Sequence, residues 1–87
     1  MKKFAFIGAG SFIFTRNLVR DLLSFPAFAD CELALMDTDP ERLERITAAV
    51  RKINAAMGAH AKITPTQSRA EALSGADGVL CTVFNGG

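Results

Sequence analysis

Short apolar runs alternate with longer amphipathic stretches along the chain. Continuous or nearly continuous apolar runs lie at 4–7, 33–36 and 79–84, as expected of strands that are buried on both faces. A shorter run at 62–66 contains Pro65, which cannot donate to a sheet ladder and therefore places its strand at a sheet edge. The pattern predicts strands in all of these segments.

The first stretch between strands has the spacing of a helix. From about 12 to 24, Phe14, Leu18 and Leu22 recur every four residues, with Val19 and Leu23 beside them. We expect these side chains to form the buried face of an amphipathic helix.

The second helix is expected from 40 to 57. Asp39 provides a capping oxygen, Pro40 suits the first helical position, and Gly58 supplies a left-handed stop. Its apolar stripe consists of Leu43, Ile46, Val50, Ile53 and Met57. A short third helix begins at Ser68, which with Glu71 fits a reciprocal capping box, and ends at Gly75.

Strands alternating with helices in the order β-α-β-α-β-α-β, joined by short connections, predict a doubly wound parallel sheet of the Rossmann-like α/β class. The predicted strand order is 3-2-1-4. Because 87 residues are fewer than a domain usually has, we interpret 1–87 as a truncated sheet, the N-terminal part of a larger domain.

Composition excludes several classes of partner. The formal net charge is +1, too small to attract nucleic acid or an anionic membrane, and no apolar run is long enough to span a bilayer. We expect a cytoplasmic protein with neither partner. Cys31 and Cys81 are expected to be buried hydrophobes, and His60 has no partner at metal-ligand spacing, so no metal residue is assigned.

Gly8 and Gly10 follow the first strand and open the first helix. This is the place of the dinucleotide-binding fingerprint G-x-G-x-x-G, in which free helix amides hold a pyrophosphate. Ser11 and Phe12, at the helix start, complete the expected loop. Ile13 replaces the third glycine, which suggests a helix set slightly further from the strand. A purely structural turn is the alternative.

Asp37 ends the second strand at about the distance past the fingerprint, roughly 20 residues, where an acid accepts hydrogen bonds from the adenosine ribose. Because Asp39 already suits the helix cap, Asp37 is the better ribose candidate, and its charge favours NAD over NADP. Arg42 is left open between the adenine, an acidic partner and solvent. Asn85, with two glycines after it, leaves the last strand at the same sheet edge, as a cofactor contact or as an ordinary loop.

These motifs together resemble the N-terminal segment of glycoside hydrolase family 4, nearer to its α-galactosidase and α-glucosidase branch. The residues that carry the resemblance are the stretches FIGAGS at 6–11, LMDTDPERL at 35–43 and GAD at 75–77, and the two glycines at 86–87. The family fingerprint is G-x-G-S, which needs no third glycine.

The resemblance implies a redox-elimination mechanism. NAD oxidises the sugar C3 hydroxyl, the aglycone is eliminated, water adds and the hydride returns, with a divalent metal, usually manganese, polarising the sugar. The residues that would bind the metal and the glycoside substrate lie further along such proteins, so no catalytic residue is assigned and we expect the chain alone to be inactive. The alternatives are the NAD-binding portion of a lactate/malate-type 2-hydroxyacid dehydrogenase and a non-catalytic folding or interaction module.

The predicted strand order leaves the strand at 79–84 with an uncovered apolar edge. Such edges pair with other chains. We therefore expect a homo-oligomer formed through this edge.

Overall fold

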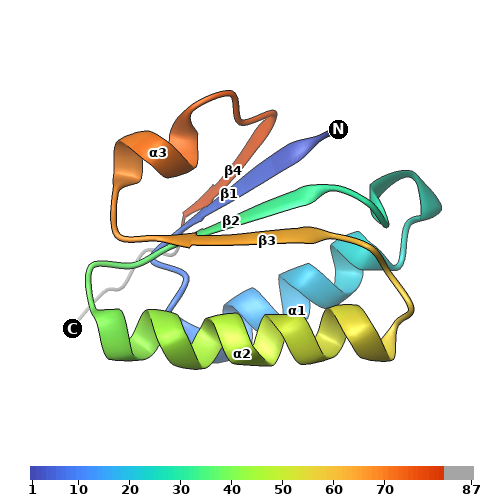
Figure 1. Cartoon of the computed structure of the whole chain (residues 1–87), viewed down its shortest axis with the longest axis horizontal. Coiled ribbons are helices and arrows are strands. Elements are labelled where there is room, and N and C mark those ends of the chain that lie inside the picture. The colour runs from blue at the N-terminus through green and yellow to red at the C-terminus, as the bar shows by residue number, and fades with distance from the viewer. Residues whose placement is uncertain (82–87) are drawn as a thin grey trace.

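Helices cover both faces of a parallel sheet in the computed structural model, which describes residues 1–81 (Figure 1). The strands are β1 (Lys3–Ile7), β2 (Glu32–Met36), β3 (Lys62–Thr66) and β4 (Gly78–Cys81). The helices are α1 (Phe12–Leu23), α2 (Pro40–Ala56) and α3 (Arg69–Leu73), with a 3-10 turn, η1 (Pro26–Phe28), after α1.

The sheet has the strand order β3-β2-β1-β4, and all neighbouring strands are parallel. This order confirms the prediction, including the edge position of the strand that contains Pro65. Helices α1 and α2 lie on one face of the sheet and α3 on the other (Figure 1). The carboxyl ends of β1 and β2 therefore open between helix layers, where ligands of such sheets bind.

The two faces of the sheet are packed differently. Large side chains, among them Phe6, Leu33 and Leu35, form the main core with α1 and α2. On the opposite face Ala5 and Ala34 pack beneath the short α3. This alternation between large and small side chains follows the two-residue period of a strand.

The buried face of α1 is the predicted one except in its first turn, and Leu18 and Leu22 pack partly buried against the core. Its buried residues are Thr15, Val19 and Leu23, whereas Phe14 is 41% exposed. Thr15 Oγ1 donates a hydrogen bond of 2.8 Å to the carbonyl of Ala9, in the loop after β1. Because that bond holds Thr15 inside, the helix turns Phe14 outward.

The predicted capping box at α3 is only half formed. Ser68 Oγ accepts a hydrogen bond of 3.2 Å from the Glu71 amide, as expected. Glu71 Oε2 instead accepts from Thr66 Oγ1 at 2.7 Å, and that hydroxyl accepts from the Ser68 amide at 3.0 Å. The Thr66 hydroxyl, at the end of β3, therefore lies between the Ser68 amide and the Glu71 carboxylate, which the capping box would have joined directly.

Two further predictions, on the cysteines and on the end of α2, have mixed outcomes. Cys31 is buried, and burial raises the pKa of its thiol, whereas Cys81 is exposed, against expectation, because it lies in the edge strand β4. Met57, the last residue of the predicted α2 stripe, is also exposed because the helix ends at Ala56.

Within residues 1–81 no helix is long and apolar enough to cross a membrane.

Candidate functional site

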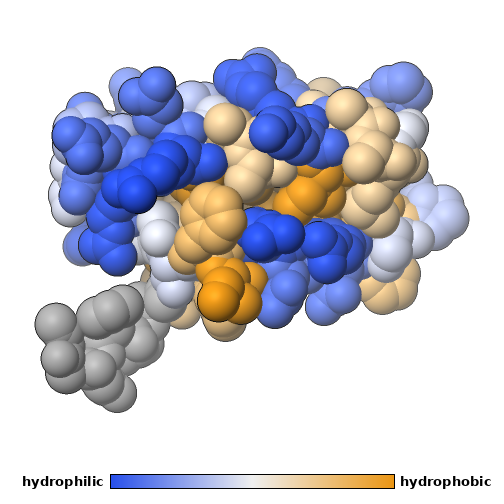
Figure 2. All heavy atoms as spheres, turned by 90° about the horizontal axis from the view of Figure 1, so that it is seen from below, coloured by the Kyte–Doolittle hydropathy of each residue, from blue (hydrophilic) through white to orange (hydrophobic). Residues whose placement is uncertain are grey.

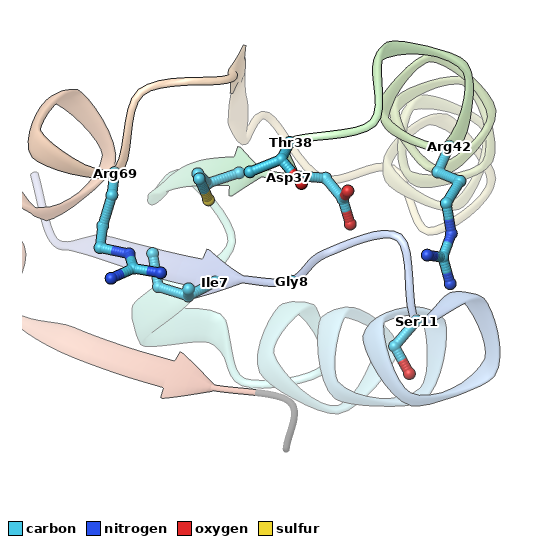
Figure 3. A pocket seen from close by; sticks show the side chains of 8 residues that line it. Ile7, Gly8, Ser11, Asp37, Thr38, Arg42 and Arg69 are labelled. Atoms are coloured by element: carbon cyan, nitrogen blue, oxygen red, sulfur yellow. The ribbon is translucent and has the colours of Figure 1, made fainter. Parts of the chain in front are cut away.

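A cavity of about 290 Å³ lies at the carboxyl ends of β1 and β2 (Figure 3). The residues that line it come from these strand ends and from the starts of α1, α2 and α3. They are Ile7, Gly8, Ser11, Met36, Asp37, Thr38, Arg42 and Arg69. Three of the predicted cofactor-binding residues, Gly8, Ser11 and Asp37, are thus brought together.

Backbone hydrogen bonds hold the glycine loop in its conformation. Gly8 has a φ of 76°, in the left-handed region that glycine adopts without strain. The Ala9 amide donates to the Met36 carbonyl at 2.8 Å, and the Ser11 amide donates back to the Gly8 carbonyl at 3.1 Å. These bonds turn the chain sharply from β1 into α1.

Asp37 leaves no space for a side chain at position 10. The Gly10 amide donates to Asp37 Oδ2 at 2.8 Å, and a Cβ at this position would lie 2.5 Å from that oxygen and 2.9 Å from Arg42 Cβ. A side chain at position 10 would therefore displace the acid.

Asp37 joins the glycine loop to the start of α2. It is only 8% exposed, and its second oxygen, Oδ1, accepts from the Asp39 amide at 2.9 Å. The cap of α2 is Asp39, whose Oδ1 accepts from the Glu41 and Arg42 amides at 3.0 and 3.3 Å. This confirms that Asp37 is not the cap. Each carboxylate oxygen keeps a further lone pair for a ligand.

The start of α1 differs from the starts of α2 and α3. Ser11 is its N-cap residue but makes no side-chain capping bond, whereas Asp39 and Ser68 both do. The amides of the first helical turn, 12–14, have no acceptor inside the helix because such an acceptor would lie before its first turn. This end of α1 therefore presents donors and a partial positive charge beside the cavity.

Two arginines line the cavity at its opposite ends. Arg42 extends from α2 toward Ser11, on the side of the glycine loop, while Arg69 reaches from α3 to the end of β1 near Ile7 (Figure 3). The sequence left the role of Arg42 open and gave Arg69 none, because Arg69 lies inside the α3 capping motif. Its position at the start of a helix, at the carboxyl edge of the sheet, is the signal that could have identified it.

The other predicted residues lie elsewhere. Phe12 is 40% exposed and lines a neighbouring cavity with Gly10 and Arg42, and its ring centroid is 5.4 Å from the Arg16 guanidinium carbon. Ile13 is 72% exposed, so it does not separate α1 from the strand. Asn85 lies outside the described residues.

The strand order, the glycine loop after β1 and the acid after β2 define a Rossmann-like α/β protein. The chain also matches the model of the family described as "Family 4 glycosyl hydrolase" over residues 3–87 and belongs to that family. This membership agrees with the resemblance seen in the sequence.

The chain is also similar to two alpha-galactosidases. It is 39% identical over 85 residues to an alpha-galactosidase of Rhizobium meliloti (strain 1021), an alignment that covers 98% of this chain and 17% of the relative. It is 36% identical over 87 residues to an alpha-galactosidase of Bacillus subtilis (strain 168), covering 100% of this chain and 20% of the relative. The chain therefore spans a fifth or less of the length of these relatives.

Proposed function

We propose that this chain is the NAD-binding portion of a family 4 glycosidase, and that the whole protein hydrolyses α-galactosides. The family match and the two alpha-galactosidase relatives support the second part. One observation carries the first part: the uncapped start of α1 and the Asp37 carboxylate border the same cavity.

The hydrogen-bond donors of the cavity suit the pyrophosphate of NAD, and its acceptors suit the hydroxyls of the adenosine ribose. The α1 amides and the Ser11 hydroxyl suit a pyrophosphate, and the remaining lone pairs of Asp37 suit the two hydroxyls of a ribose. The same carboxylate would repel a 2′-phosphate, which favours NAD over NADP. When bound, NAD would supply a hydride acceptor for oxidation of the sugar.

The described residues do not supply a metal centre. Within residues 1–81 there is no group of three or more histidine, cysteine, aspartate or glutamate side chains that could hold a metal ion. We therefore assign manganese, the glycoside and the bond cleavage to other parts of the whole protein.

Titration of the purified chain with NAD and NADP by calorimetry tests the cofactor assignment. We expect saturable binding of NAD and binding of NADP that is about tenfold weaker or worse, the effect of about 1.4 kcal/mol of charge repulsion. No heat at millimolar NAD would contradict the proposal and favour a module without cofactor affinity.

We also propose that the chain self-associates through the outer edge of β4. Within the described residues β4 is the last strand of the sheet order, and Val79 on it is 50% exposed. Light scattering should report a dimer or a larger species that Val79→Lys dissociates, while Ala70→Lys, at an exposed position of α3, has no effect. A wild-type monomer at high concentration would contradict this.

A further inference from the structure

The side-chain cap of α3 does not involve Arg69. It is the first residue of α3 and is exposed, while Ser68 caps that helix and Ala72 is its buried residue. Its side chain nevertheless lines the cavity at the carboxyl edge of the sheet. We propose that the Arg69 guanidinium stacks on the adenine ring of the bound dinucleotide, a role that rests on the proposed function.

The cavity near Arg69 has an apolar floor. Ile7 and Met36 are the last residues of β1 and β2. Met36 belongs to the small cluster on the α3 face of the sheet, and Ile7 packs partly buried against that cluster. Arg69 faces the end of β1 from the neighbouring helix (Figure 3). A planar guanidinium opposite apolar side chains suits a flat heteroaromatic ring, because guanidinium groups stack on the faces of bases.

The polar groups of the cavity favour a base over a phosphate at Arg69. The α1 start and Arg42 lie on the glycine-loop side of Asp37, whereas Arg69 and Ile7 lie on the other side (Figure 3). A ribose held by Asp37 would direct its phosphate toward the α1 amides and its base toward Arg69. Arg69 is thus a specificity-determining residue for a planar base.

Charge-conserving and shape-conserving variants separate stacking from ion pairing. Arg69→Lys keeps the charge but loses the planar group, and Arg69→Met keeps an unbranched stem without charge. The matched control is Arg51→Met, at an exposed position of α2 outside this cavity. Calorimetry gives the NAD affinity of each variant, and saturation-transfer NMR reports how closely the adenine protons contact the protein.

We expect Arg69→Met to weaken NAD binding by about three- to thirtyfold, the range of a cation–π contact, and Arg69→Lys to weaken it by about threefold, because an ammonium keeps the cation–π attraction but loses the planar stack. Both variants should also reduce saturation transfer to the adenine protons relative to the ribose protons, while Arg51→Met changes neither. Full affinity in Arg69→Lys together with a loss in Arg69→Met would assign Arg69 to a phosphate and overturn the proposal, as would no change in either. If wild-type protein binds no NAD, the proposed function itself fails.

Discussion

The two long helices begin in different ways, although both follow a parallel strand. At α2, Asp39 accepts hydrogen bonds from the amides of Glu41 and Arg42, and Pro40 removes one donor altogether. At α1, Ser11 makes no side-chain cap and the first-turn amides are left without a partner from the cap residue. The start of α2 is completed by its own residues, whereas the start of α1 has no side-chain cap.

The acid after β2 links the two helix starts. Asp37 accepts one hydrogen bond from Gly10, ahead of α1, and one from Asp39, ahead of α2. The surface view from the side of α1 and α2 shows apolar groups next to strongly polar ones rather than a uniform face (Figure 2). The two helix starts therefore differ in their capping residues. The start of α2 is capped by Asp39, whereas the start of α1 has no side-chain cap and is held next to Asp37 by the Gly10 amide.

The largest expected effect comes from adding one carbon at Gly10. In Gly10→Ala the new Cβ would lie 2.5 Å from Asp37 Oδ2, so the loop and the acid must separate. We expect unfolding in urea to report a loss of about 1 to 3 kcal/mol of stability. Calorimetry should show NAD binding weakened by about 100-fold, because the acid and the α1 amides, at about 1.5 kcal/mol each, are displaced together.

Gly58→Ala is the control for backbone strain. Gly58 has a φ of 66° and nothing within 4 Å of an added Cβ, so its substitution strains the backbone without a clash. It should cost about 1 to 2 kcal/mol of stability and leave the NAD affinity unchanged. If both variants weakened NAD binding equally, the loss in Gly10→Ala would be an effect of lower stability and not of the geometry at the start of α1.

The second effect tests the charge of the acid with a smaller change, which breaks at most one of the two backbone hydrogen bonds that Asp37 accepts. Asp37→Asn keeps the side-chain size and one acceptor but removes the charge. We expect NAD binding to weaken by about tenfold to a hundredfold, the scale of hydrogen bonds to a charged group, and the preference over NADP to narrow.

Asp77→Asn is the matched control because Asp77 Oδ2 also accepts a backbone hydrogen bond, from the Lys3 amide at 2.8 Å, away from the cavity. It should leave both cofactor affinities unchanged. If Asp37→Asn lowers the melting temperature and nothing else, Asp37 serves only to join the two helix starts.

The sequence predicted the elements and their order in the sheet, which follow from the hydrophobic pattern and from the rules for connecting parallel strands. Apolar runs and helix spacing were sufficient for the strand order, and Asp39 next to a proline was sufficient for the cap of α2. The errors arise from side-chain hydrogen bonds whose partners are near in sequence but which no hydrophobic pattern specifies. The bond from Thr15 to the Ala9 carbonyl places Thr15, in place of Phe14, on the buried face of α1, and Thr66 accepts and donates the bonds at α3 that Glu71 was expected to make.

The same limit applies to the candidate site. The glycine loop and Asp37 follow known spacings, so both were predicted, but the contact that makes Gly10 small joins two separate loops. Arg69 enters the cavity from a helix that precedes the last strand, and only the crossover of the sheet brings it to β1. Residue spacing contains no information about either approach.

The smallest effect compares the two caps directly. Asp39→Ala removes two accepted hydrogen bonds and should cost about 1 kcal/mol of stability in urea unfolding, whereas Ser11→Ala removes no capping bond and should cost close to nothing. For NAD the order should reverse: Ser11→Ala loses a hydroxyl contact to the pyrophosphate, worth about 1 kcal/mol or fivefold in affinity, while Asp39→Ala has little effect. A stability loss in Ser11→Ala equal to that in Asp39→Ala would mean that α1 is capped in solution, and the comparison between the two helix starts would then fail.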